Sequence, residues 1–255
     1  MSITLIDRNL MEQSEARHQF SICICKSGSP EFLIGEKVAQ HMYRKAWKTR
    51  AYASKGTYAV VVSKLHPNGD STPLANVNFM PRDLNNRLPS ESIFGERNWE
   101  CHGLDGAQGI AEICGLAIDD ATPPEMRRAV LMMMSMGLQS IALHTKTRWL
   151  VTIQHAFLIR ILRQFLGLPF VASSLPIRCD AELPRDEYWS RDVMPRLYLL
   201  DTHDRATRLA CETFFYYLSS LGMTLQITNR ISAAASSYSG FLREWESRSL
   251  IASPA

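Results

Sequence analysis

The fold of this chain is decided by the stretch Ile110-Ala111-Glu112-Ile113-Cys114-Gly115-Leu116-Ala117-Ile118. This stretch is apolar on both sides, which is typical of a central strand that is buried on both faces. A Pro-Pro loop and a long Met-rich helix to about His144 follow it, and then a short strand over Arg148 to Ile153. A helix over Gln154 to Leu166 closes the second strand–helix unit. This alternation predicts an α/β chain with a mixed sheet.

The segments before the central strand predict a helix and a hairpin. Apolar residues recur at helical spacing from Glu31 to about Tyr52. Thr57 to Lys64 and Pro73 to Met80 predict two strands joined by a turn. The polar stretch from Pro81 to Gly109 is rich in turn formers and predicts a long loop with little regular structure.

The segments after the central strand predict further helices and strands. Asp119 to Thr122 offers an N-cap for the Met-rich helix. Short strands are expected over Phe170 to Ser173 and Arg196 to Leu200. His203 to Gly222 and Ile227 to Leu250 predict two helices. We therefore expect one domain over residues 1–200, with a mixed central sheet flanked by helices, and a C-terminal helical extension over residues 201–255.

Composition excludes several classes of protein. With 255 residues, 46% of them hydrophobic and 21% charged, the chain is long and apolar enough for a sizeable core. The net charge of +3 is too small to indicate nucleic-acid binding. The start lacks the features of a signal peptide, and no apolar run reaches the length of a membrane span. The six cysteines lack metal-ligand or disulfide spacing, and the histidines are scattered. We expect no metal and a reducing cytoplasm.

Glu112 is the first candidate for chemistry. A carboxylate inside an apolar strand is costly to bury unless it is paired or neutralised. Burial raises the pKa of such a group toward the range that suits a general base. The alternative is a Glu on a solvent-facing surface or one that pairs with an arginine for structural reasons.

The residues after Glu112 suggest a thioester site. The Cys114 side chain points to the same side of the strand as Glu112, and a thiol there could serve as a nucleophile. However, no histidine stands in a recognisable relation to Cys114, and buried cysteines are usually inert. Gly115 inside a strand indicates a bulge or a close ligand. A free backbone N–H near Gly115 and Leu116 would polarise a thioester carbonyl.

Two composition biases have both a functional and a structural interpretation. Met132, Met133, Met134 and Met136 either pack in an ordinary core or form an adaptable pocket for an alkyl chain. A basic stretch either faces an acidic partner or is a solvated surface. That stretch contains Arg127, Arg128, Lys146, Arg148, Arg160 and Arg163.

The order of elements around Glu112 resembles the GNAT acyltransferase fold, and in particular the autoinducer synthases and the N-acyl amino acid synthases. The basic and aromatic helix from His41 to Arg50, the step Phe79-Met80-Pro81 and the later Leu88-Pro89 carry this resemblance. The strand around Glu112 also resembles that of thermostable-haemolysin-like proteins. Homoserine-lactone synthases carry two arginines where Asn78 and Gly115 stand here, which argues against a lactone product.

The resemblance implies an N-acyltransferase that moves a fatty acyl group from an acyl-carrier-protein or acyl-CoA thioester to an amine such as an amino acid, with no resident cofactor. The loop from Asp119 to Glu125 has no glycine and is a poor pyrophosphate cradle, which favours a carrier protein. The alternatives are a non-catalytic lipid- or protein-binding module and a haemolysin-like membrane-active protein. Oligomeric state is open.

The roles expected for individual residues follow from this interpretation. Glu112 would accept the ammonium proton, and backbone near Gly115 and Leu116 would hold the carbonyl. The residues expected to bind substrate are Trp47, Asn78, Cys114, Met133, Trp149, Val151 and Thr152. The residues expected to border the entrance for the donor are Arg127, Arg128, Arg148 and Arg163.

Overall fold

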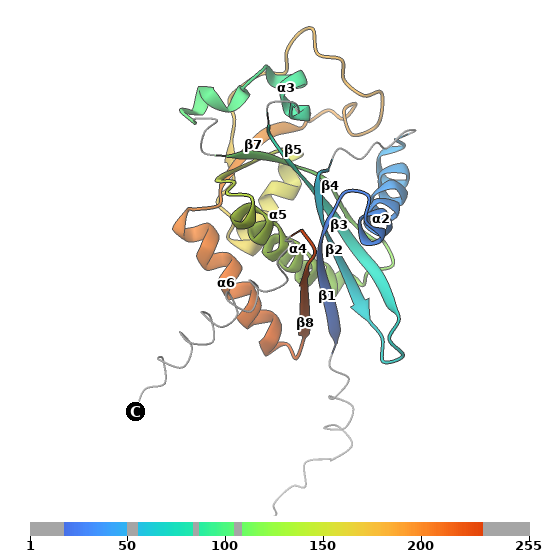
Figure 1. The fold of residues 1–255 in the computed structure, drawn as a ribbon. Helices are drawn as coiled ribbons and strands as arrows, with labels where there is room; N and C mark the ends of the chain where they lie inside the picture. The colour runs from blue at the N-terminus through green and yellow to red at the C-terminus, as the bar shows by residue number, and fades with distance from the viewer. Residues whose placement is uncertain (1–17, 50–55, 84–86, 105–108, 232–255) are drawn as a thin grey trace, which may run out of the picture.

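A computed structural model describes residues 18–49, 56–83, 87–104 and 109–231 of the chain (Figure 1). One eight-stranded sheet has the strand order β6-β7-β5-β4-β3-β2-β1-β8. Its strands are β1 (Gln19–Lys26), β2 (Tyr58–Leu65), β3 (Ser71–Pro81), β4 (Ile110–Ile118), β5 (Trp149–Gln154), β6 (Val171–Ala172), β7 (Arg196–Asp201) and β8 (Thr224–Asn229). The helices are α2 (Pro30–Trp47), α3 (Pro89–Phe94), α4 (Pro124–His144), α5 (Ala156–Leu166) and α6 (Arg205–Ser220), with a 3-10 turn, η2, at Asn98–His102.

The sheet is mixed, as predicted. Strands β1 to β4 are antiparallel neighbours, β4 and β5 are parallel, and β7 runs antiparallel between β5 and β6. The expected hairpin is β2–β3, and the two expected parallel strands are β4 and β5. Helix α4 connects them, which confirms the strand–helix alternation around Glu112.

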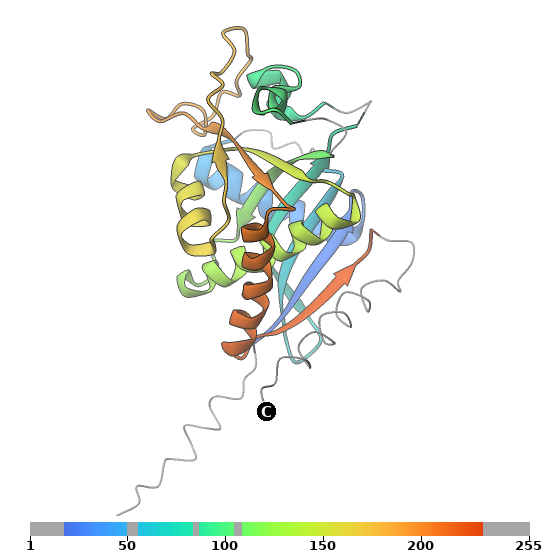
Figure 2. The same ribbon diagram turned by 90° about the vertical axis from the view of Figure 1, so that its left-hand side faces the viewer.

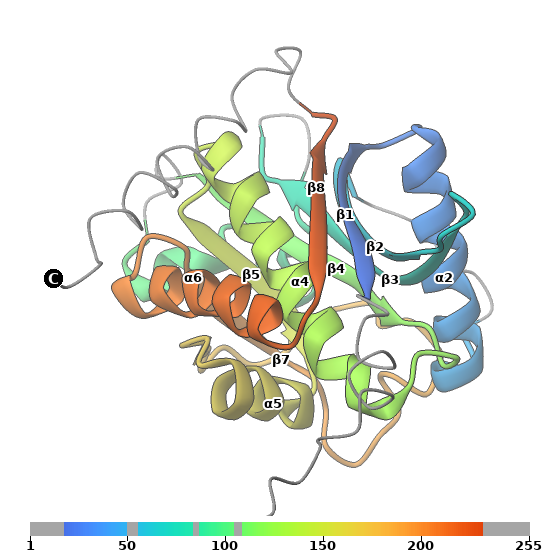
Figure 3. The ribbon, with the colours of Figure 1, turned by 90° about the horizontal axis from the view of Figure 1, so that it is seen from below.

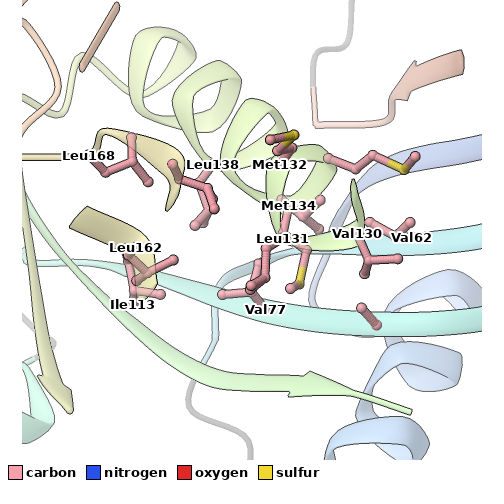
Figure 4. Close-up of a cluster of buried hydrophobic side chains, with 14 of the residues drawn as sticks. Val62, Val77, Ile113, Val130, Leu131, Met132, Met134, Leu138, Leu162 and Leu168 are labelled. Atoms are coloured by element: carbon pink, nitrogen blue, oxygen red, sulfur yellow. The ribbon is translucent and has the colours of Figure 1, made fainter. Parts of the chain in front are cut away.

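Helices cover both faces of the sheet (Figure 3). Helix α2 lies on one face, and α4, α5 and α6 lie on the other. The main core is on the second face, where α4 packs over the central strands and contributes Met132, Met133 and Met134. Figure 4 shows Met134 between α4 and the strand that carries Val77, and Met132 on the other side of the helix. These methionines are at most 3% exposed, and Met132 and Met133 belong to the core in the ordinary way. Met134 belongs to the core and also lines an apolar pocket, so both interpretations stay open for it.

Helix α2 packs unusually close to the sheet. Ser29 caps it by accepting a hydrogen bond from Phe32 N at 3.2 Å, and Pro30 suits its first turn. A Cβ atom on Gly35 would lie 2.3 Å from Asn76 Oδ1 and 2.7 Å from Val61 Cγ2. Only glycine permits this approach. It brings Glu36, the next residue of α2, close enough to β3 to accept a hydrogen bond from Asn78.

Gly35→Ala should therefore destabilise the protein by about 1–3 kcal/mol, the usual cost of overpacking a core. The buried Asn76 amide and the β2 backbone around Val61 have little room to move away. Lys37→Ala, an exposed change on the same helix, is the matched control and should stay within about 0.5 kcal/mol of the parent. Chemical denaturation of both variants measures the difference, and equal stability would contradict the close packing.

The predicted loop over Pro81 to Gly109 is wrong in its middle part. Residues 87–104 form α3 and η2, and Trp99 is 2% exposed in a second core with Leu88 and Phe94. The Glu91 carboxylate organises this segment because it accepts hydrogen bonds from Leu88 N and Arg97 N. Figure 2 shows that α3 lies at the same end of the sheet as residues 173–195.

Other boundaries also differ from the predictions. Helix α2 ends at Trp47 with Lys48 in a left-handed conformation, and residues 50–52 of the predicted helix lie outside the described residues. No side chain caps α4: Asp119 instead accepts from Ala121 N at 2.9 Å and shapes the preceding turn.

The two ends of the described chain meet in the sheet. Strand β1 was not predicted. The helix predicted from Ile227 is wrong at residues 227–229, because they belong to β8, which pairs in parallel with β1. Residues 232–250 of that helix lie outside the described residues. The expected boundary at residue 200 stays a prediction, although the sheet continues across it.

Candidate active site

Strands β4 and β5 separate just after Glu112. Their pairing covers Ile110–Trp149, Ala111–Leu150 and Glu112–Val151 and goes no further. The predicted divergence of the two strands is therefore confirmed. Across the opening, Thr152 Oγ1 donates a hydrogen bond to Ile113 O at 3.0 Å.

Gly115 lies at an irregularity on the other edge of β4. The register moves from Asn78–Cys114 to Asn76–Ala117, so two residues of β4 face one residue of β3. Gly115 has a φ of +60°, a conformation that favours glycine. This irregularity is a β-bulge, one of the two features expected for Gly115 from the sequence, and a bulge leaves its extra residue unpaired. The backbone of Gly115 and Leu116 therefore lies beside the opening between β4 and β5.

A narrow apolar pocket opens from this divergence into the face that carries α4, α5 and α6. Its cavity volume is about 40 Å³, and the space that includes its open mouth is about 600 Å³. Leu116 and Thr152 are among its lining residues, and Met134 supplies a flexible side chain from α4. Figure 4 shows other lining residues, Ile113, Leu131, Leu138, Leu162 and Leu168, gathered between β4, α4 and the α5 end. This shape and polarity suit an alkyl chain.

Glu112 lies on the opposite face, toward α2 and α3, and is 2% exposed. Ser90 N, in the first turn of α3, donates a hydrogen bond to Glu112 Oε2 at 2.8 Å. A backbone N–H satisfies one oxygen and fixes the carboxylate without neutralising it. The expectation of a buried carboxylate in β4 is confirmed, and a raised Glu112 pKa stays a prediction.

Two asparagines of β3 extend the polar site beside Glu112. Asn78 stands opposite Cys114, and its Nδ2 donates to Glu36 Oε1 at 2.7 Å. Asn76 Nδ2 donates to Asn78 Oδ1 at 3.0 Å and to Gly115 O at 3.3 Å. This chain of amides links α2 to the bulge of β4.

Aromatic residues form the wall of the site away from β3. Trp47, the last residue of α2, stacks on His155 with ring centroids 5.4 Å apart and meets the Tyr188 ring edge-on at 5.0 Å. Tyr188 OH donates to Ile153 O at 2.6 Å. Burial lowers the pKa of His155, which favours its neutral form. The wall thus joins α2, β5 and residues 173–195.

Two tyrosine hydroxyls show which groups surround the site. Burial raises the pKa of Tyr43, and Cys114, Asp186 and Glu36 raise it further. Burial also raises the pKa of Tyr188, and Tyr43, Asp186 and Glu112 add to that effect. Cys114 thus acts on Tyr43 and Glu112 acts on Tyr188, while Asp186 acts on both hydroxyls.

The structure divides the four arginines expected at the donor entrance. Arg127 and Arg128 start α4, next to the loop that follows β4: Arg127 binds Thr122 O, and Arg128 binds Phe165 O at 3.0 Å. Arg163 is exposed on α5. Arg148 does not lie at the opening. It precedes Trp149, where the β4–β5 ladder begins, and it donates a hydrogen bond to Asp201 there.

Three further predicted residues do not line the pocket, although Val151 pairs directly with Glu112 in the β4–β5 ladder. Met133 is fully buried in the main core. Trp149 and Val151 pack in the second core with Leu197 and Leu199, at the paired end of β4 and β5. Cys114, in contrast, is two residues from Glu112 on β4, and Asn78 pairs with it. Trp47 belongs to the aromatic wall, and Thr152 lies at the opening.

Sequence reasoning missed several residues of this site. Ser90, Glu36 and Asp186 were not singled out by any motif, and Tyr43 lies in the basic and aromatic helix without having been singled out in it. Pro89 at the first position of a helix and Glu91 two residues later were available as signs of a helix start. Within the described residues, no three His, Cys, Asp or Glu side chains are grouped to hold a metal. No helix in the described ranges is long and apolar enough to cross a membrane.

The fold is that of the GNAT-like acyltransferases, with an opened β4–β5 pair over an apolar pocket. One similar solved structure is FeeM, an N-acyl amino acid synthase from uncultured soil microbes: TM-score 0.50, 13% identity, over 78% of this chain and 98% of that one. Another is BjaI, a CoA-dependent acyl-homoserine lactone synthase: TM-score 0.50, 10% identity, over 88% of this chain and 99% of that one. No family model matches the sequence, and no curated protein matches it.

Proposed function

We propose that this protein is an N-acyltransferase that transfers a fatty acyl group from a thioester to a primary amine. The observation that carries the proposal is the position of Glu112 at the point where β4 and β5 separate, with an apolar pocket on the other side of the sheet. The amino acid implied by the sequence resemblance is one member of this class of acceptors.

The geometry supports a direct attack across the opening. The acyl chain occupies the apolar pocket, which requires Met134 and the neighbouring leucines to move, and the thioester carbonyl lies beside the β4 bulge. Glu112 accepts a proton from the ammonium group, and the free amine attacks the carbonyl carbon. Backbone N–H groups near Gly115 and Leu116 stabilise the oxyanion. The C–S bond then breaks, the nitrogen loses its second proton as the amide forms, and the departing thiolate takes up that proton.

We further propose acyl carrier protein as the donor and the reducing cytoplasm as the location. The glycine-free loop before α4 supports a donor without a pyrophosphate cradle. Arg160 and Arg163 are exposed on α5. The same helix lines the pocket through Leu158 and Leu162, so the two arginines suit an acidic carrier that docks there. All six cysteines are free, in keeping with a reducing compartment.

Arg160→Glu combined with Arg163→Glu should raise the KM for acyl carrier protein by about tenfold at low salt, because rim charges act mainly on association. The difference from the parent should shrink as salt screens the charges. A small soluble thioester is the control donor and should be used at the parental rate. Steady-state kinetics with both donors decide the matter. Equal loss on both donors would contradict a docking role.

Mass spectrometry of the purified protein with a long-chain thioester and primary amines tests the function. We expect an N-acyl amine that forms faster with acyl carrier protein than with acyl-CoA. Absence of amide product with both donors would contradict the proposal.

A further inference from the structure

The region around Glu112 is rich in negative charge. Glu36 reaches it from α2 and is held by the Asn78 amide. Asp186 reaches it from residues 173–195, where Thr49 Oγ1 and Tyr188 N donate hydrogen bonds to its carboxylate at 3.2 and 3.1 Å. Because the three carboxylates come from separate segments, the charge belongs to the assembled site and not to one stretch of sequence.

The hydroxyls of Tyr43 and Tyr188 indicate the sign of the charge at their own positions. The groups that raise their pKa values, after burial, are acidic side chains or other titratable hydroxyl and thiol groups. Of these groups, the carboxylates of Glu36, Asp186 and Glu112 are the ones that carry a negative charge at neutral pH. Their charge favours a cationic ligand group between them.

Two arginines border this region, and both already have aromatic or acidic neighbours. The Arg191 guanidinium lies 4.5 Å from the centre of the Trp47 ring. Arg82 is 3.4 Å from the Glu91 carboxylate and lies over the Trp99 ring. Arg191 is thus the group that would receive a ligand carboxylate, if the ligand had one.

Two buried acceptor oxygens add to the evidence. Ser90 Oγ belongs to the residue whose N–H binds Glu112, is fully buried, and has no hydrogen-bond partner within the described parts of the chain. Asn76 Oδ1 is likewise buried without a partner in those ranges, but it faces Gly35 of α2, so Ser90 Oγ carries the argument. Burying such oxygens without a donor is costly, and an ammonium group brings three N–H donors. Ser90 Oγ can therefore accept a hydrogen bond from a ligand ammonium group beside Glu112.

We propose that the acceptor is a cationic amine without a carboxylate, and that a diamine is the simplest case. One nitrogen is acylated beside Glu112, and the second stays protonated and is held by Glu36. The register supports this arrangement because Asn78, which holds Glu36, stands opposite Cys114, two residues from Glu112. This inference rests on the proposed acyl transfer and names its acceptor class.

Three amines of equal chain length test the inference with a decanoyl thioester. In 1,4-diaminobutane the far end is cationic, in 1-aminobutane it is neutral, and in 4-aminobutanoate it is anionic. We expect kcat/KM to fall in that order, by about tenfold or more at each step, since hydrogen bonds to charged groups are the strong ones. A preference for 4-aminobutanoate would overturn the inference.

Glu36→Gln should reduce the preference for 1,4-diaminobutane over 1-aminobutane to about one. Glu31→Gln is the matched control on the same helix, since Glu31 pairs with Arg230 at 2.6 Å, and it should leave that ratio unchanged. An unchanged ratio in Glu36→Gln would overturn the assignment of the second nitrogen. If 4-aminobutanoate is preferred and its acylation needs Glu112, acyl transfer stands and only the acceptor class is wrong. If none of the three amines is acylated and the thioester is not consumed, the proposed function fails as well.

Discussion

Glu112→Gln should lower the rate of amide formation by about 10²–10⁴-fold, the usual range for loss of a general base. Glutamine has nearly the size of glutamate, and its carbonyl oxygen can still accept the hydrogen bond from Ser90 N. The loss should therefore come from the missing proton acceptor. Single-turnover measurement of N-acyl product at a fixed pH gives the effect.

The control for this variant is its folding. Because Glu112 is buried, its replacement by a neutral amide should leave the denaturation midpoint equal to or above that of the parent. If Glu112→Gln does not fold, the role of Glu112 is structural. Product formation at the parental rate in a folded variant would remove Glu112 from the chemistry.

Ser135→Phe should lower kcat/KM for a long-chain thioester by about a hundredfold. Ser135 lines the apolar pocket from α4, and a phenyl ring there occupies space that the acyl chain needs. Excluding about four methylene groups, at ~0.8 kcal/mol each, costs ~3 kcal/mol, or about two orders of magnitude. Competition between decanoyl and acetyl donors measures the effect.

The acetyl donor and a second variant are the controls for Ser135→Phe. A chain of two carbons does not reach the ring, so its rate should stay near that of the parent. Ser140→Phe makes the same change on α4 at a residue that does not line the pocket, and it should preserve the preference for decanoyl. Equal loss on both donors would show that the pocket does not hold the chain.

The central part of the fold could be predicted because its signals are local. Strands β4 and β5 are short apolar runs, and Pro123, Gly167 and Pro169 mark the ends of the helices beside them. β1 carries apolar residues on both faces, so it lacks the alternation of a half-buried strand. In β8 the alternation of Leu225 and Ile227 was present, but the Ala- and Ser-rich sequence after it favoured a helix.

The candidate site was predictable only where one strand carries it. Glu112 is visible in the sequence because a carboxylate interrupts an apolar run. Its partner Ser90 lies 22 residues earlier, and Glu36 lies 42 residues before Asn78, so only tertiary packing brings them together. Packing also explains why Met133 lies in the main core and the Val151 side chain in the second core, since their apolar character suits a core as well as a pocket.

The short ladder between β4 and β5 implies a trade-off between stability and turnover. Three residue pairs join β6-β7-β5 to the other five strands, and Thr152 adds one hydrogen bond beyond them. A long substrate enters where β4 and β5 separate. Widening this opening admits the ligand and at the same time loosens the core. Substitutions that fill the pocket or lengthen the ladder should make the protein more heat-resistant and slower at once. Selection for speed then keeps the centre of the sheet weak.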